Sequence, residues 1–467
     1  MLFSSQPFLF FFLPAVLFFY FVVLRDVHKR NVLLFFTSLF FYAWGEPHFV
    51  LVMLFSIAVN WFLGRHCERR SGDEQRVRQY FWLAVAFNVA VLFVFKYLGF
   101  VVRTFAELFG GSSDFAIVLP IGISFFTFQE LSYIIDIYQG KARPFRHFMD
   151  TGLYIAFFPQ LIAGPIIRFD NFSSQLLTRR ESIDGFISGI ELFGIGFAKK
   201  ILVANALARV ADLSFDMSPA ALTAPLAWLG TLAYTFQIYF DFSGYSDMAI
   251  GLARMFGFDF PANFRYPYIS RSIAEFWRRW HISMGSFFRD YVYFPLGGSR
   301  VSSSWRLIWN LLVVWALTGL WHGANWTFLV WGLYFFVLLV TERACKKIAW
   351  PKLFQALQWP VVFLLVMFGW VLFRANSLTH AAEYAWRMIS TDAWTVDRFF
   401  LQHLVEYLPE FLVAGLASTP LAPYLQSRLP SWLVIQIIKH VWVLFIIVLA
   451  LGALDVSSFN PFIYFNF

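Results

Sequence analysis

Charged residues and cysteines are scarce in this 467-residue chain. Asp, Glu, Lys and Arg make up 14% of the residues and hydrophobic residues make up 59%, whereas soluble domains carry about 25% charged residues. The two cysteines, Cys67 and Cys345, are too few for a disulfide scaffold or a cysteine-rich metal site, and we expect no bound metal. Internal repeats and Gly/Ser-rich linkers are also missing. The composition therefore excludes a soluble chain and favours a single membrane domain over residues 1–467.

Long apolar stretches make up much of the chain, and few long polar segments separate them. A helix that crosses the hydrocarbon core needs roughly 20 apolar residues, so we predict an all-α polytopic membrane protein with about 11–13 transmembrane or re-entrant helices. The stretches lack the alternation of β-barrel strands. They cover residues 8–24, 31–44, 48–64, 81–102, 115–138, 151–167, 185–208, 226–256, 307–341, 359–373, 403–420 and 432–453. Prolines at 159 and 165 predict a broken or re-entrant helix within 151–167, and residues 375–402 are expected at a membrane interface.

The net charge of +8 fits membrane topology better than a nucleic-acid partner, and we expect no nucleic acid to bind. Basic residues gather in the short segments 25–30, 65–78 and 141–147. The positive-inside rule places these segments in the cytoplasm and Met1 outside, with membrane lipid as the surrounding partner. The first apolar stretch has no basic residue before it and no small-residue cleavage site, so we interpret it as a retained helix.

His322 is the first candidate catalytic residue. It lies near the middle of residues 307–341, a stretch without Asp, Glu, Lys or Arg, and an ionisable group in such a stretch invites a functional hypothesis. A neutral imidazole can take a proton from a hydroxyl, as acyl transfer from a thioester to an alcohol requires. The alternative is a structural histidine bonded to a neighbouring helix. If the helix continues through Gly319 and Gly323, three residues are expected near the face that carries His322, namely Trp315, Thr318 and Trp326. If the helix breaks there, the imidazole is expected to face a cavity made by the break.

A second block, residues 273–293, combines aromatic and basic side chains around His281. Treated as one continuous helix, it places His281 between an apolar stripe and a basic edge. One interpretation is an interfacial helix that meets anionic lipid. The other is the mouth of a site for an anionic acyl donor, in which arginines hold coenzyme A phosphates. The candidate donor- or substrate-binding residues are Trp277, Arg278, Arg289, Asp290, Tyr291, Trp321, Asp241 and Tyr245.

Four carboxylates lie within apolar stretches, and we expect them to act in structural pairs rather than in chemistry. They are Glu130, Asp136, Asp241 and Asp247. The expected partners of Asp241 and Asp247 are buried arginines such as Arg254 and Arg271. Small residues beside Asp241 and Asp247, within residues 239–251, permit close helix packing.

These blocks together carry a resemblance to a known family. Residues 119–138, 158–168, 239–251, 267–298, 319–326 and 461–467 resemble the membrane-bound O-acyltransferase family, in particular the branch typified by the membrane subunit of bacterial alginate O-acetyltransferases. The resemblance covers nearly the whole chain. It implies a ring of helices around a thinned central core. By this resemblance His322 corresponds to the family's essential intramembrane histidine, and His281 to a second histidine on the cytoplasmic side of the core.

The resemblance also implies a reaction. An acetyl group would pass from a cytoplasmic thioester, with acetyl-CoA as donor substrate and no bound cofactor, across the bacterial inner membrane to an exported polysaccharide such as alginate. The chain contains no Gly-x-Ser-x-Gly motif, so the resemblance implies a separate partner, a periplasmic or membrane-tethered SGNH-type esterase-like protein that reaches the polysaccharide.

Three alternatives remain open at this point. One is the transfer of D-alanyl or another acyl group from a carrier protein, and another is O-acetylation of peptidoglycan or cellulose. A transporter or flippase would share the many helices and the buried polar groups. Secondary transporters, however, often carry repeats between their halves, which this sequence lacks.

Overall fold

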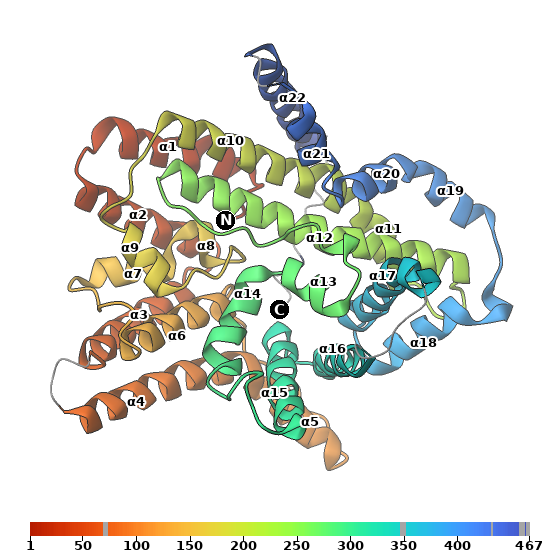
Figure 1. The fold of residues 1–467 in the computed structure, drawn as a ribbon, viewed down its shortest axis with the longest axis horizontal. Coiled ribbons are helices and arrows are strands. Elements are labelled where there is room, and N and C mark those ends of the chain that lie inside the picture. The colour runs from red at the N-terminus through yellow and green to blue at the C-terminus, as the bar shows by residue number, and fades with distance from the viewer. Residues whose placement is uncertain (69–72, 346–351, 431–432, 457–462, 464–467) are drawn as a thin grey trace. The chain divides into compact units, whose positions relative to one another are not determined.

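The computed structural model describes residues 1–68, 73–345, 352–430, 433–456 and 463. Every regular element in this part of the chain is helical, which confirms the all-α prediction (Figure 1). The chain forms two compact units. The first unit contains Met1–Phe193 and Ser246–Pro261, and the second contains Gly194–Tyr245 and Ala262–Phe467. Residues 69–72 of the second basic segment, and the C-terminal block 461–467 apart from Ile463, lie outside the described residues.

The first unit begins with a helix that is α-helical at its centre and π-helical at both ends. Short helices in its second half alternate with irregular segments. Its elements are η1 (Phe8–Phe12), α1 (Leu13–Phe18), η2 (Phe19–Val23), α2 (Val27–Ala43), α3 (Phe49–His66), α4 (Glu74–Leu92), η4 (Phe93–Tyr97), α5 (Leu98–Leu108), α6 (Ile123–Tyr138), α7 (Phe148–Ala156), α8 (Phe158–Leu161) and α9 (Phe169–Gln175). Helices α10 (Ile183–Ala198) and α12 (Ala224–Met255) contain residues of both units.

The predicted break within residues 151–167 is confirmed. Helix α7 ends before Phe157, whose backbone (φ −52°, ψ 113°) is not helical, and α8 starts directly after it. Protein groups satisfy the backbone near the break, since the amide of Phe158 donates to Ser38 Oγ at 3.0 Å and Tyr154 Oη donates to the carbonyl of Ile167 at 2.9 Å. The break is therefore compatible with a membrane interior, where a freed polar group costs several kcal/mol.

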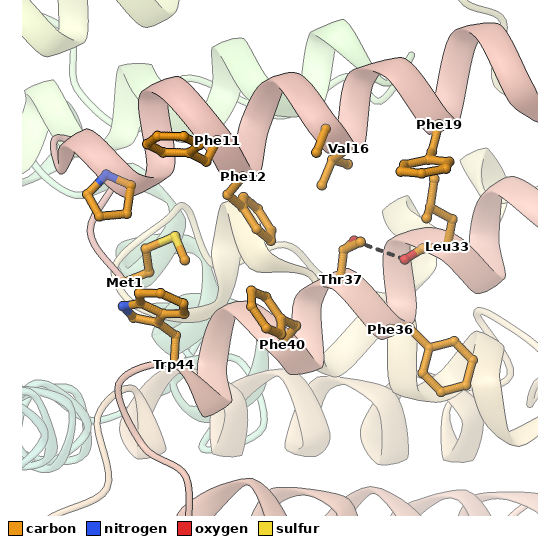
Figure 2. Close-up of a pocket in the computed structure, with 12 residues that line it drawn as sticks. Met1, Phe11, Phe12, Val16, Phe19, Leu33, Phe36, Thr37, Phe40 and Trp44 are labelled. Atoms are coloured by element: carbon orange, nitrogen blue, oxygen red, sulfur yellow. Dashed lines mark hydrogen bonds between the residues drawn. The ribbon is translucent and has the colours of Figure 1, made fainter.

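An apolar groove of about 530 Å³ runs between α1 and α2 (Figure 2). Phe12, Val16 and Phe40 form part of its wall, and Trp44 lies at one end. The Thr37 hydroxyl in this wall donates to the carbonyl of Leu33 at 2.9 Å, so its bonding capacity is used within the helix. The groove suits an apolar group better than a polar ligand.

The second unit carries longer helices and ends in a long apolar helix that packs near Gly194. Its elements are η5 (Lys199–Ala204), α11 (Asn205–Asp216), η6 (Pro267–Ile269), α13 (Ile273–Arg279), α14 (Ile282–Phe288), η7 (Arg289–Tyr293), α15 (Ser304–His322), α16 (Trp326–Cys345), α17 (Lys352–Arg374), α18 (Leu378–Ile389), η8 (Thr391–Ala393), α19 (Arg398–Glu406), α20 (Leu408–Ala417), α21 (Leu421–Arg428) and α22 (Leu433–Val456). A core of packed tryptophan, tyrosine and phenylalanine rings joins α13, α15, α16 and α17.

Five helices in the described residues are long and apolar enough to cross a membrane. They are Phe49–His66, Glu74–Leu108, Trp326–Cys345, Gln355–Arg374 and Val434–Leu454. Other predicted stretches are divided, because residues 185–208 fall into α10, η5 and α11, and residues 307–341 fall into α15 and α16. The structure thus has the helices of a multi-pass membrane protein, while the count of about 11–13 crossings stays a prediction.

Candidate active site

His322 lies at the end of a tightly packed helical hairpin. A Cβ atom on Gly319 would lie 2.4 Å from the carbonyl oxygen of Phe328, and one on Gly332 would lie 2.4 Å from that of Trp315. Glycine at both positions therefore lets the backbones of α15 and α16 touch. Helix α15 ends at His322, and α16 begins at Trp326. The helix breaks directly after the histidine, which is one of the two arrangements that the sequence allows.

Aromatic rings surround the His322 imidazole. Only 2% of the residue is exposed. Its ring centroid lies 4.9 Å from that of Trp331, edge to face at 83°, and 5.2 Å from that of Phe373. Such T-shaped contacts are the favourable arrangement for aromatic rings. Packing from α16 and α17 therefore fixes where the imidazole lies.

His281 is not within a helix, and the prediction of one continuous helix over 273–293 is wrong. Helix α13 ends at Arg279, α14 begins at Ile282, and His281 between them has the left-handed backbone φ 44°, ψ 55°. A side chain other than glycine in this region costs of order 1–2 kcal/mol. A distant segment holds this turn, since the amide of Ile282 donates to the carbonyl of Asn263 at 2.9 Å. The helical-wheel placement of His281 fails because sequence periodicity cannot show such a partner.

Asn263 determines which nitrogen of His281 carries the proton. Its Oδ1 accepts hydrogen bonds from the amide of Ser283 at 3.1 Å and from Ser283 Oγ at 2.9 Å. A backbone amide can only donate, so this atom must be the side-chain oxygen. The same oxygen lies 3.1 Å from His281 Nδ1, which must therefore be the protonated nitrogen. Nε2 of His281 is then the basic nitrogen, and it has no hydrogen-bond partner among the described residues.

His281 is uncharged at neutral pH in this environment. Its side chain is fully buried, and burial lowers its pKa to about 3, because desolvation disfavours the charged form. The imidazole is therefore neutral, with Nε2 unprotonated, before any substrate binds. Sequence reasoning missed Asn263, since nothing in its local pattern marks a residue that acts on a histidine in another segment.

Trp321 joins the two histidines in one aromatic cluster. Its ring centroid lies 5.8 Å from that of His281 and 4.9 Å from that of His322. Phe242 packs edge-on against His281 from α12 at 4.6 Å. Two histidines that are distant in sequence thus share one indole neighbour, as expected if both belong to one site.

A cavity of about 480 Å³ opens beside His281. Three of the predicted donor-binding residues line it, namely Trp277, Arg278 and Arg289, and Trp315 and Thr318 contribute from α15. Arg278 and Arg289 are exposed, so both cations remain hydrated at its edge. The cavity therefore combines a basic edge with an indole wall.

Other predicted binding residues lie outside the wall of this cavity. Asp290 forms an ion pair with Arg289 at 2.7 Å and so orients a residue that lines it. Tyr291 is buried and packs against Phe287, with ring centroids 4.8 Å apart. Tyr245 is buried within α12. None of these three residues lines the cavity.

Asp241 has a lysine partner, so the prediction of a pair with Arg254 or Arg271 is wrong. Lys200 Nζ lies 2.6 Å from Asp241 Oδ1, with both side chains almost completely buried. Asp241 Oδ2 accepts a hydrogen bond from the amide of Ile463 at 2.9 Å. The carboxylate therefore neutralises a buried cation and holds a residue near the C-terminus, which is a structural task.

The all-helical architecture and the buried histidine pair define an enzyme that works within a membrane. A neutral base beside a cavity with a basic edge suits transfer of an acyl group from an anionic donor. The comparison with family models gives the particular class. The model described as MBOAT, membrane-bound O-acyltransferase family, matches residues 146–380, which include both histidines and the whole cavity wall.

Curated relatives agree with the family match. The chain is 44% identical over 406 residues to the probable alginate O-acetylase AlgI of Azotobacter vinelandii, covering 85% of this chain and 80% of the relative. It is 38% identical over 492 residues to the protein of the same name in Pseudomonas putida, covering 100% of both. A peptidoglycan O-acetyltransferase of Helicobacter pylori is 33% identical over 452 residues, covering 88% of this chain and 83% of the relative. The chain belongs to the membrane-bound O-acyltransferase family and is a multi-pass membrane O-acyltransferase.

Proposed function

We propose that this protein takes an acetyl group from acetyl-CoA in the cytoplasm and moves it across the bacterial inner membrane for O-acetylation of an exported polysaccharide such as alginate. The observation that carries the proposal is the aromatic cluster in which Trp321 contacts both His281 and His322. The names of the relatives from Azotobacter and Pseudomonas support acetyl as the group and alginate as the polysaccharide. Acetyl-CoA is a substrate in this proposal, not a bound cofactor.

His322 is the general base of the proposed reaction. As the acceptor hydroxyl attacks the thioester carbonyl, His322 takes its proton and later gives that proton to the leaving thiolate. A base of this kind contributes about 10²–10⁴-fold to the rate. His281 is the second catalytic histidine, and its unprotonated Nε2 is available for a substrate proton.

The cavity beside His281 is the proposed donor site. Arg278 and Arg289 would bind the phosphates of coenzyme A at its edge, since guanidinium groups make strong, often bidentate bonds to phosphate. Trp277 and Trp315 would pack against the pantetheine arm. The bond of Asp290 to Arg289 fixes the plane of one guanidinium before the donor arrives.

A separate protein completes the proposed pathway. We propose that a periplasmic or membrane-tethered SGNH-type protein receives the acetyl group and places it on sugar hydroxyls. Its absence would leave donor binding intact and abolish acetylation of the polysaccharide. The two steps are therefore separable in a reconstituted system.

The proposed orientation keeps the basic segments in the cytoplasm and Met1 outside. Lys141 offers a test, because its side chain is 39% exposed. In a variant without Cys67 and Cys345, Lys141→Cys should resist an impermeant thiol reagent in intact cells and react after the cells are opened. Labelling of this cysteine in intact cells would show that the proposed orientation is wrong.

Reconstitution with labelled donors tests the function itself. Purified protein in liposomes is given radiolabelled acetyl-CoA, with alginate and its SGNH-type partner on the opposite side. We expect label on alginate only when both proteins are present. In parallel reactions, peptidoglycan replaces alginate or a labelled D-alanyl carrier protein replaces acetyl-CoA. Label on peptidoglycan but not on alginate would favour the activity named for the Helicobacter relative. Transfer from the D-alanyl carrier protein but not from acetyl-CoA would overturn the acetyl-CoA proposal.

A further inference from the structure

Two buried indole N–H groups in the second unit have no acceptor among the described residues. They belong to Trp277 and Trp331. An indole nitrogen can only donate, and buried donors in native proteins are nearly always bonded. The neighbouring Trp370 shows the usual arrangement, since its Nε1 donates to Tyr268 Oη at 3.2 Å. An unbonded donor in so well packed a cluster therefore requires an explanation.

Resting on the acyl transfer proposed above, we propose that Trp331 is a further catalytic residue. Its Nε1–H donates to the oxyanion that forms on the thioester carbonyl oxygen. Trp331 is completely buried, and its ring lies edge to face against His322 at 4.9 Å. A base and an oxyanion donor must both reach the same reacting group. Trp277 lines the cavity beside His281 and does not share this contact with His322.

The proposed transfer has two stages, attack of the hydroxyl and loss of the thiolate. The hydroxyl oxygen forms a bond to the carbonyl carbon, its proton moves to His322, and the π pair of the carbonyl moves to oxygen. Trp331 Nε1–H binds that negative oxygen. The C=O bond then re-forms, the C–S bond breaks, and the thiolate takes the proton from His322. The products are an ester and a free thiol.

Packing holds Trp331 in place before the substrate binds. Its ring stacks on Trp370 at 6.2 Å and meets Phe373 edge-on at 5.1 Å. The backbone next to it is fixed because Gly332 lies against the carbonyl of Trp315. A donor that is already oriented in an apolar environment stabilises a developing charge without reorganisation.

Replacing the indole nitrogen tests the proposal. In Trp331→benzothienylalanine, made by stop-codon suppression, sulfur takes the place of N–H and the ring keeps its shape. We expect kcat for acetyl transfer to fall about 10²–10³-fold, with the affinity for acetyl-CoA unchanged. Trp331→Phe should show the same fall in kcat together with some loss of stability. The matched control is Trp370→benzothienylalanine, which removes a bonded N–H from a ring in the same stack and should leave kcat near that of the unmodified protein.

The outcomes separate this inference from the proposed function. If the unmodified protein transfers acetyl from acetyl-CoA and the Trp331 isostere does so at the same kcat, the donor role of Trp331 is overturned while the proposed function stands. An equal fall in kcat for both isosteres would also overturn it, because the effect would then come from packing. If the unmodified protein itself transfers no acetyl group, the proposed function fails and this inference fails with it.

Discussion

The regions around His281 and His322 hold a buried imidazole in two different ways. His281 lies in a left-handed turn, where Asn263 fixes its tautomer through Nδ1. His322 ends a helix, and rings from Trp331 and Phe373 pack against its imidazole. Hydrogen bonding specifies which nitrogen is basic, whereas ring packing specifies where the ring lies. The site therefore fixes the tautomer of His281 by hydrogen bonding and the ring position of His322 by packing.

The two regions are also expected to affect the rate of acetyl transfer in different ways. If His322 is the base, its replacement removes the proton transfer, whereas the replacement of Asn263 changes only the orientation and tautomer of His281.

The largest effect is expected for His322→Gln. Glutamine keeps similar bulk and some hydrogen bonding but cannot accept a proton as a base, so acetyl transfer should fall about 10²–10⁴-fold. The variant adds no charge to an apolar helix and should fold. His403→Gln is the control, since His403 bonds the carbonyl of Phe399 in its own helix at 2.8 Å. Near-normal acetylation by His322→Gln, at matched expression, would make His322 a structural residue.

Composition and apolar stretches predicted the fold class, because a helix in a membrane must satisfy its own backbone and must be apolar along its length. They also predicted the break at Phe157, where a nearby proline marks the sequence. They could not divide the chain into its helices, since π-helical turns such as η5 interrupt a stretch that contains no proline.

The candidate site was predictable in its residue types and not in its geometry. His322 stood out because an ionisable group in an apolar stretch is costly. The turn at His281, the role of Asn263 and the pairing of Asp241 with Lys200 all depend on contacts between distant segments. Local spacing carries no information on such contacts.

The next effect is expected for Asn263→Ala, which releases the tautomer of His281. Loss of the hydrogen-bond partner of a metal-binding histidine typically costs about 10–100-fold in activity, and by analogy we expect a fall of that size in acetyl transfer. Asn310→Ala is the control, because Asn310 is also buried but bonds the carbonyl of Gly298. Equal activities for the two variants would show that Asn263 only stabilises the fold.

A smaller effect is expected when the hairpin beneath His322 is forced apart. In Gly319→Ala, the added Cβ meets a backbone oxygen at 2.4 Å, which cannot move aside as a side chain would. Overpacking of this kind costs about 1–3 kcal/mol, so the melting temperature in detergent should fall. Gly415→Ala, with nothing within 4 Å of its added Cβ, should be neutral or slightly stabilising. Equal melting temperatures for the two variants would contradict the close contact of α15 and α16.

The smallest effect is expected at the donor cavity, where Arg289→Ala should weaken acetyl-CoA binding about tenfold, as expected for loss of a charged hydrogen bond of about 1.5 kcal/mol. The side chain of Arg289 is 53% exposed, so solvent screens its charge and a larger loss is not expected. The affinity of the original protein should also fall as salt rises, and that of Arg289→Ala should fall less steeply.

Arg428→Ala is the matched control for this last variant, because Arg428 is exposed on α21 and packs on Tyr424 in the same helix. It should bind acetyl-CoA as the original protein does. Trp277→Ala should weaken binding as well, since it removes an indole from the cavity wall. If acetyl-CoA affinity were unchanged in both Arg289→Ala and Trp277→Ala, helices α13 and α14 would be interfacial anchors, and the anionic donor would have to bind elsewhere in the chain.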